Sequence, residues 1–200
     1  WFQDVLLRVD QLREWVGHDE MQLPICLWVS GLFNPTAVLT AVKQVSARQD
    51  SLPLDQMTTE THITAMQTSE DCVKRGARPP SGIYIHGLFM EGAQWLSGED
   101  AEDFQSTVDG VQCAGFVTDS LLKDLLPALP VVYIKAVQVE KEWQPTSVGY
   151  LRSDSDLYNC PVYTTMSRGP TYVFLAYLKT VDPASKWILA GVALIMQSDA

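Results

Sequence analysis

The stretch GIYIHGLFMEGAQWL, Gly82 to Leu96, contains the features on which the interpretation of the whole chain depends. Its first residues are β-branched, aromatic and alternating, which predicts a strand. Gly87 and Gly92 have the spacing of the glycines in a phosphate-binding loop, and Glu91 stands alone among apolar residues. The stretch is therefore either an active site or a piece of architecture.

The residues that follow the two glycines argue against phosphate binding. A phosphate loop needs a lysine and a serine or threonine directly after its second glycine. In this chain Gly92 is followed by Ala93 and Gln94. We therefore expect Gly87 and Gly92 to allow a bend or bulge and a tight turn.

The other suggestive side chains of the stretch also have a structural explanation. No second acid lies within seven residues of Glu91, and a buried carboxylate is normally paired. We expect Glu91 to bind local backbone or a basic neighbour. His86 is expected to be a half-buried strand residue rather than a ligand, and Trp95 to pack against the β-subdomain.

Residues 53–200 are rich in short runs of β-type composition. Besides GIYIHGLFM, the candidate strands are TTETHITAM, GVQCAGFV, PVVYIKAVQV, PVYTTM, TYVFLAYLKT and ILAGVALIM. They do not alternate regularly with helices, as a parallel sheet would require. We predict an α+β fold in which this part forms an antiparallel β-barrel of about six short strands, with one short helix near 119–126.

Residues 1–52 are predicted to form a helical subdomain. A first helix, ended by Gly17, has apolar residues at the spacing of one face, namely Phe2, Val5, Leu6, Val9, Leu12 and Val16. A second begins with Asn34 as its cap and Pro35 in its first turn. Its predicted apolar face consists of Ala37, Val38, Ala41, Val42 and Val45. We expect the two helices to pack against each other.

Composition restricts the classes of partner. The net charge is -10 and the pI about 4.6, which argues against nucleic acid and anionic membranes because both attract basic surfaces. The longest strongly apolar run, Trp187–Met196, is shorter than the about 20 residues of a membrane-spanning helix. Because the sequence opens without a cap residue and apparently inside a helix, we expect it to be part of a longer protein.

Searches for catalytic and metal sites find no constellation. The four cysteines, Cys26, Cys72, Cys113 and Cys160, form no CxxC pair, and we expect buried free thiols in a reducing compartment. His18, His62 and His86 lack metal-ligand spacing, and no GxSxG nucleophile motif is present. Lys135 is expected to be ion-paired or outward-facing. No catalytic, cofactor-binding or metal residue is predicted in this chain.

Several segments, taken in order, resemble the C-terminal domain of dynein heavy chains. FQDVLLRVDQLREW and LWVSGLFNPTAVLTAVKQVSAR resemble its start, and GIYIHGLFMEGAQW resembles its strand-and-turn motif. LPALPVVYIKAV, YNCPVYTT and WILAGVALIMQSD match later landmarks. The resemblance spans nearly all of the chain, and the GLFMEGAQW and CPVY forms are similar to the axonemal branch. Gly87, Glu91, Gly92 and Trp95 match the family motif and are expected to be structural.

The resemblance implies a non-catalytic module that braces the AAA+ ring of the same heavy chain and modulates its cycle. ATP and magnesium would be bound in upstream AAA+ modules of the parent. The parent would contact microtubules and dynein intermediate and light chains, and would power ciliary or flagellar beating. The implied location is the cytoplasm and cytoskeleton, in the axoneme of a cilium or flagellum. The resemblance implies no nucleic-acid or membrane partner.

A second hypothesis comes from the aromatic residues and from Glu91 with His86. Tryptophan side chains can stack on sugars, and a carboxylate in apolar surroundings can act as an acid or base. These features would suit a free-standing β-barrel that binds a ligand or acts as a hydrolase. The absence of a second acid near Glu91 in the sequence counts against a hydrolase.

Overall fold

The structure, a computed structural model, describes residues 2–17, 24–76, 78–96, 106–113, 115–122, 124–140, 143–146, 149–151 and 156–196. In these residues the α-helices are α1 (Phe2–Gly17), α2 (Pro35–Gln49), α3 (Ser69–Arg75) and α4 (Ala184–Ala190). The strands are β1 (Cys26–Trp28), β2 (Met57–Ile63), β3 (Ile83–His86), β4 (Phe89–Glu91), β5 (Ala93–Leu96), β6 (Ser106–Val108), β7 (Val111–Cys113), β8 (Phe116–Ser120), β9 (Val132–Gln138), β10 (Gln144–Thr146), β11 (Gly149–Leu151), β12 (Leu157–Tyr163), β13 (Tyr172–Lys179) and β14 (Ala193–Ile195). The protein is thus α+β, as the sequence predicted.

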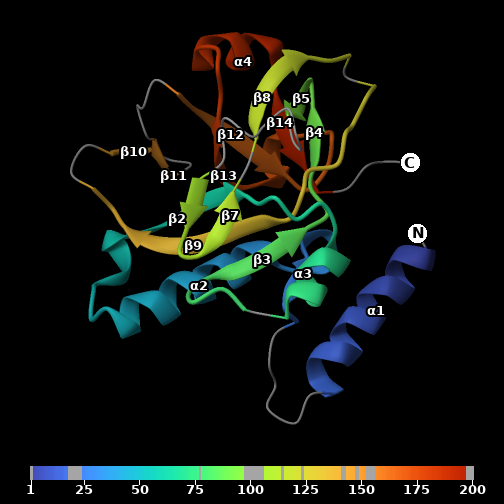
Figure 1. Cartoon of the computed structure of the whole chain (residues 1–200), viewed down its shortest axis with the longest axis vertical. Coiled ribbons are helices and arrows are strands. Elements are labelled where there is room, and N and C mark those ends of the chain that lie inside the picture. The colour runs from blue at the N-terminus through green and yellow to red at the C-terminus, as the bar shows by residue number, and fades with distance from the viewer. Residues whose placement is uncertain are drawn as a thin grey trace.

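The strands form separate sheets, so the predicted barrel is wrong. One four-stranded sheet has the order β1-β3-β9-β2 and another the order β13-β12-β14-β4. The remaining described strands pair as β10-β11, β5-β8 and β6-β7. Most neighbours are antiparallel, but β1 runs parallel to β3 and β12 parallel to β14. None of these sheets closes on itself (Figure 1).

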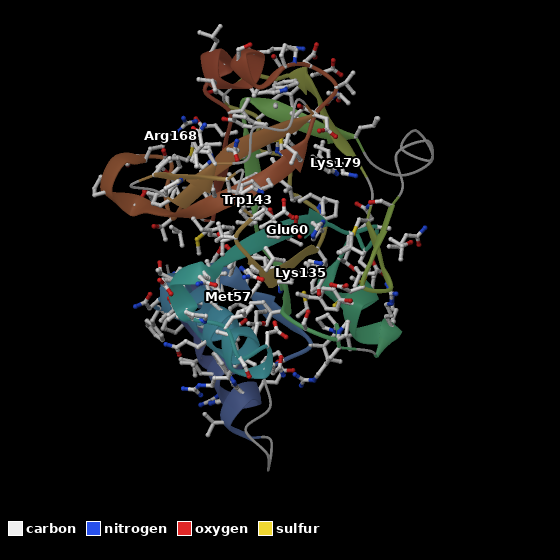
Figure 2. All side chains as sticks on the ribbon, turned by 90° about the vertical axis from the view of Figure 1, so that its left-hand side faces the viewer. Met57, Glu60, Lys135, Trp143, Arg168 and Lys179 are labelled. Carbon is white, nitrogen blue, oxygen red and sulfur yellow. The ribbon has the colours of Figure 1, made fainter. Side chains whose placement is uncertain are left out.

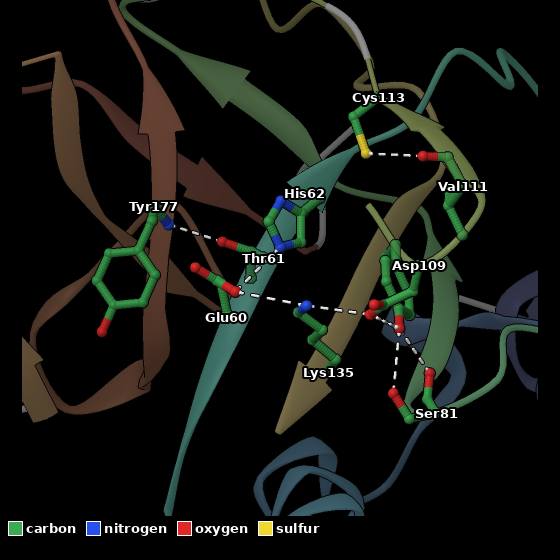
Figure 3. Close-up of polar contacts among 10 residues, drawn as sticks. Glu60, Thr61, His62, Ser81, Asp109, Val111, Cys113, Lys135 and Tyr177 are labelled. Atoms are coloured by element: carbon green, nitrogen blue, oxygen red, sulfur yellow. Dashed lines mark hydrogen bonds and ion pairs between the residues drawn. The ribbon is translucent and has the colours of Figure 1, made fainter. Parts of the chain in front are cut away.

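The two larger sheets meet where β2 and β13 lie edge to edge. In Figure 2 the strand that carries Met57 and Glu60 lies below the strand that ends at Lys179. The backbone N–H of Tyr177 on β13 donates to Oγ1 of Thr61 on β2 over 2.7 Å (Figure 3). The backbone N–H of Tyr177 on this edge strand is therefore bound by a threonine hydroxyl. In a closed barrel, a backbone carbonyl of the neighbouring strand would accept it instead.

The predicted helix near 119–126 is also wrong, because Asp119 and Ser120 belong to β8. Two other short helices occupy the region predicted to be β. A capping box made by Thr68 and Asp71 begins α3. The C-terminal apolar run divides into α4 and β14 at Gly191, whose φ of 67° ends the helix. Apolar periodicity alone does not distinguish a short buried helix from a strand.

The second predicted helix has the expected start but a different buried face. Oδ1 of Asn34 accepts the N–H of Ala37 at 3.0 Å, so the predicted cap is confirmed. Of the predicted apolar face, Val42 is buried and Val45 is 53% exposed. The buried residues of α2 are Leu39, Val42, Ser46 and Ala47. They turn toward β2 and β9, beneath which α2 runs in Figure 1.

Two groups of buried side chains hold the fold together. The larger contains residues of both four-stranded sheets and α2, with Trp187 of α4 fully buried. The smaller surrounds Tyr84 and Tyr133, beside Cys72 of α3. All four cysteines are free, and three are buried, which confirms most of the thiol prediction; Cys26 is only half-buried. No described helix has both the length and the apolar character needed to cross a membrane.

Candidate docking surface on the first helix

The first helix presents its apolar face away from the body of the molecule. Its most exposed apolar side chains are Phe2, Val5, Leu6, Leu7, Val9 and Val16, with exposed fractions from 36% to 74%. The half-buried residues of the helix are Arg8, Gln11, Leu12 and Trp15, which recur at the spacing of a different face. Of the predicted apolar face, only Leu12 is turned inward. This is the reverse of the usual amphipathic arrangement.

Polar contacts join this helix to the rest of the molecule. Oε1 of Gln11 accepts the backbone N–H of Trp28 at 2.9 Å, and Nε2 of Gln11 donates to the carbonyl of Trp28 at 3.3 Å. The amide thus pairs with the backbone at the end of β1 in place of another strand. Because α1 is held here, it does not pack along α2 as predicted, and Figure 1 shows it apart from the sheets.

A groove of about 980 Å³ lies between α1, β1 and α3. Asp10, Gln11 and Glu14 line it from α1, and Arg78 and His86 from the opposite side. Burial lowers the pKa of His86 below its usual value of 6.5, so its imidazole is neutral at pH 7. The groove is therefore acidic along the α1 side and carries a guanidinium on the other.

The indole of Trp28 explains two glycines of the sequence. A Cβ at Gly31 would lie 2.6 Å from Cε3 of Trp28, and one at Gly87 would lie 2.6 Å from its Cδ1. Gly87 also has a φ of 88°, which a side chain would strain. The indole thus lies against the backbone at Gly31 and at Gly87, where any residue with a Cβ would collide with it. Spacing alone predicted a bend at Gly87 but not the ring that needs the space.

Glu91 is paired with a cation from a distant segment. It is 6% exposed, and its Oε2 accepts from Nε and Nη2 of Arg168 at 3.1 and 2.6 Å. Nη2 of Arg168 also donates to the carbonyl of Gly191 at 2.6 Å. Arg168 has a φ of 53°, an uncommon value for a residue with a side chain. This ion pair, which we call the Glu91–Arg168 clasp, joins β4 to the β12–β13 connection and to the end of α4.

The last two residues of the motif are explained by different features, Gly92 by its backbone conformation and Trp95 by its packing. Gly92 has a φ of 84° between β4 and β5, and a Cβ there would lie 3.5 Å from the carbonyl oxygen of Ala190. Trp95 is half-buried against the larger core. A Cβ at Gly115 would lie 2.1 Å from Nε1 of Trp95, so glycine is needed there as well.

A polar cluster joins β2 and β9 to the turn between β6 and β7 (Figure 3). Nζ of Lys135 lies 3.0 Å from Oδ2 of Asp109 and 3.9 Å from Oε2 of Glu60. His62 places Nε2 3.2 Å from the same Glu60 oxygen. The hydrogen bond from Lys135 lowers the pKa of the Asp109 carboxyl. The prediction that Lys135 is ion-paired is confirmed, and an ion-paired ammonium is a poor nucleophile.

Within the described ranges, no three His, Cys, Asp or Glu side chains are placed to hold a metal ion. His62 and His86 lie on different strands, β2 and β3, and His18 is outside the described residues. The functional features that sequence reasoning missed are Gln11, Arg168 and the outward face of α1. Of these three, only the apolar face of α1 had a signal in the sequence, namely its helical periodicity. Periodicity does not show whether such a face points toward the body of the molecule or away from it.

Known proteins match this chain over nearly its whole length. Residues 1–196 match the family model described as the C-terminal domain of the dynein heavy chain. The protein is 41% identical over 197 residues to dynein axonemal heavy chain 9 of Homo sapiens, covering 98% of this chain and 4% of that protein. It is 42% identical over 202 residues to the dynein alpha chain of the flagellar outer arm of Chlamydomonas reinhardtii, covering 100% of this chain and 4% of that protein. A ciliary dynein beta chain of Tripneustes gratilla is 38% identical over 197 residues, with 98% of this chain and 4% of that protein covered. The chain therefore spans about 4% of the length of these relatives.

Proposed function

The chain belongs to the family of dynein heavy-chain domains found at the C-terminus, and we propose that it braces the AAA+ ring of its own heavy chain. In this role the domain performs no chemistry. It supplies a rigid body whose contacts with the ring favour some ring conformations over others. ATP binding and hydrolysis, with magnesium, take place in the AAA+ modules of the parent.

One observation carries the bracing role, namely the outward apolar face of α1. Phe2, Leu6 and Val16 are 68%, 47% and 74% exposed, although they recur at the spacing of a helix face that normally packs. Burying a large apolar side chain stabilises a complex by roughly 1.5–3 kcal/mol. A face with several such side chains suits a permanent contact within one protein better than a face in water.

The names of the relatives support a cellular location for the parent protein. Their names describe axonemal, ciliary and flagellar outer-arm dyneins. We assign the parent of this chain to the axoneme of a cilium or flagellum, where it would move on microtubules and drive beating. Intermediate and light chains would be partners of the parent. The acidic charge of -10 gives this domain no affinity for anionic surfaces such as nucleic acids.

Amide hydrogen exchange tests the docking face. We expect the amides of α1 to exchange at least about tenfold more slowly in the full heavy chain than in the 200-residue chain alone, because a packed helix opens less often. Equal exchange in both forms would contradict the proposal. Upstream sequence offers a second check, since P-loop-bearing AAA+ modules must precede Trp1 in the parent.

Substitutions on the same face connect docking to motor function. Leu6→Glu with Val9→Glu keeps helix propensity while placing charge in the proposed contact. We expect microtubule-stimulated ATP turnover of the full heavy chain to change several-fold. Val45→Glu on α2, a side chain 53% exposed and outside α1, is the matched control and should leave turnover unchanged. Equal effects from both variants would show that surface charge alone is responsible.

The hydrolase hypothesis is not favoured. Glu91 is clasped by Arg168 and almost fully buried, so its carboxylate is not presented to a substrate. His86 lies instead on the wall of the groove beside α1. A panel of glycans and esters should show no turnover by the protein, and Glu91→Gln should not alter that result.

A further inference from the structure

Two cysteines lie on neighbouring elements beside the groove, and one of them lines its wall. Cys26 begins β1 and Cys72 lies in α3, the short helix that packs against β1. Cys72 is fully buried in the smaller core, and Cys26 packs against that core from its edge. The two thiols lie close enough for each to shift the pKa of the other. Residues 46 positions apart in the sequence thus present a thiol pair without a CxxC motif.

Cys26 differs from the other three cysteines in its access to solvent. Cys26 is half-buried and lines the groove of about 980 Å³. Cys113 is 6% exposed and Cys160 is 0% exposed, and neither lines this groove. A small oxidant entering the groove therefore meets Cys26 first, because Cys72 belongs to the core against which Cys26 packs. Cys113 and Cys160 serve as internal references.

The surroundings of the two cysteines shift the pKa values of their thiols in opposite directions, which affects thiol–disulfide exchange. The hydrogen bond from Cys26 and the charge of Arg75 lower the pKa of Cys72, against the opposing effect of burial. The same hydrogen bond, with burial, raises the pKa of Cys26. The thiolate, which is the species that attacks disulfides, is therefore favoured on Cys72, where it can accept the proton of Cys26.

We propose that Cys26 and Cys72 form a reversible disulfide that fastens α3 to β1 at the wall of the groove. The site is a modification site for a low-molecular-weight disulfide of the glutathione class. It is independent of the bracing role, because it concerns the inner wall of the groove and not the outward face of α1.

The chemistry needs only that oxidant. Cys26 passes its proton to the Cys72 thiolate as its sulfur attacks one sulfur of the small disulfide, so a mixed disulfide forms and one small thiolate leaves. That small thiolate takes the proton from Cys72, whose thiolate then attacks Sγ of Cys26, forming the internal disulfide and releasing the second small thiolate. Two protein thiols give up two electrons and two protons, and the small disulfide becomes two small thiols.

The test uses the full heavy chain in buffers of stepwise decreasing ratio of reduced to oxidised glutathione. Free thiols are then alkylated under denaturing conditions, and peptides are identified by mass spectrometry. We expect a cross-linked peptide joining Cys26 to Cys72 that disappears on reduction. Cys113 and Cys160 should remain fully alkylated. Oxidation should slow amide exchange in α3 by about tenfold, because a cross-link restricts local opening.

Variants separate the proposal from general oxidation. Cys26→Ser should abolish both the cross-link and the slowing of exchange in α3. Cys72→Ser should leave Cys26 as a stable glutathione adduct, and Cys113→Ser should leave the cross-link intact. A persistent glutathione adduct on Cys26 in the unmodified protein would overturn the proposal, as would oxidation of Cys113 or Cys160 before the pair.

Discussion

Individual residues of the Gly82–Leu96 stretch are explained by partners that lie far away in the sequence. Gly87 makes room for the indole of Trp28, and Glu91 meets Arg168 at a separation of 77 residues. Neither partner could be named from the stretch itself. The motif therefore acts as a junction at which distant parts of the molecule are fastened together.

The role of Gly87 can be tested by adding a methyl group. Gly87→Ala combines a strained φ of 88° with a Cβ 2.6 Å from Cδ1 of Trp28. Gly110→Ala is the matched control, since its φ is 75° and no atom lies within 4 Å of its Cβ. We expect a loss in free energy of unfolding of about 1 kcal/mol for Gly110→Ala and at least about 3 kcal/mol for Gly87→Ala. Urea denaturation measures both, and equal losses would show that Trp28 adds nothing.

The clasp at Glu91 can be tested by removing one charge. Glu91→Gln leaves the Arg168 guanidinium partly buried without its counter-ion, and we expect a loss of about 2–3 kcal/mol in unfolding free energy. Asp182→Asn makes the same chemical change in the Lys186–Asp182 pair, whose side chains are 41% and 40% exposed. That control should lose no more than about 0.5 kcal/mol. A loss of this small size for Glu91→Gln would contradict a stabilising clasp.

At the scale of elements, α1 shows how a correct periodicity can lead to an incorrect packing prediction. Its apolar spacing predicts a helix, and the structure has one at Phe2–Gly17. The residues turned inward, however, include Gln11, whose two hydrogen bonds join α1 to Trp28, beside the apolar Leu12 and Trp15. A similar shift occurs in α2, where Ser46 and Ala47 are buried while Val45 is exposed.

Removing the Gln11 amide should loosen α1 without unfolding the body of the molecule. Gln11→Ala deletes both hydrogen bonds to Trp28 while retaining helix propensity. We expect amide exchange of α1 to accelerate by about thirtyfold, since the two lost bonds cost about 1 kcal/mol each and about 1.4 kcal/mol corresponds to a factor of about ten. Glu14→Ala, on an exposed position one turn later, should leave exchange unchanged. Acceleration spread over β9 and β12 as well would indicate global destabilisation instead.

At the scale of the whole molecule, the junction of the two four-stranded sheets replaces barrel closure. The sheets are joined along β2 and β13, where Tyr177 donates to the hydroxyl of Thr61. Thr61→Val keeps the shape of the side chain but leaves the buried N–H of Tyr177 without this acceptor. We expect a loss of about 1–3 kcal/mol in unfolding free energy. Thr59→Val, two residues earlier on the same strand, should change it by less than about 0.5 kcal/mol, and equal losses would remove the special role of Thr61.

Stability of the whole molecule should also depend on pH through His86. Burial holds its pKa below 6.5 in the folded protein, so below pH 6.5 the unfolded protein binds more protons. Stability therefore falls as pH decreases from 6.5 toward the folded pKa, by at most about 1.4 kcal/mol per pH unit. Urea midpoints at pH 7.5, 6.5 and 5.5 measure the slope. His86→Gln should remove its contribution, and an unchanged slope would exclude His86 as its source.

Protonation of Asp109 should lower the stability of the protein at a lower pH than protonation of His86 does. The pKa of this carboxyl is lowered mainly by its hydrogen bond from Lys135, so its stabilising effect is complete above pH 3.8. The effect is lost as the pH falls through the folded pKa. The contributions of His86 and Asp109 are therefore separable by pH.

The sequence by itself determined the family, the positions of several strands and the start of α2. These features depend on ordered motifs or on short-range physics, such as the Asn34 cap and the alternation in β2. Only the tertiary structure decided that the sheets stay open, that Arg168 clasps Glu91 and that the apolar face of α1 points outward. These outcomes depend on which distant segments meet, because ion pairs, edge contacts and buried faces act through space, whereas sequence periodicity reports only on neighbours in the sequence.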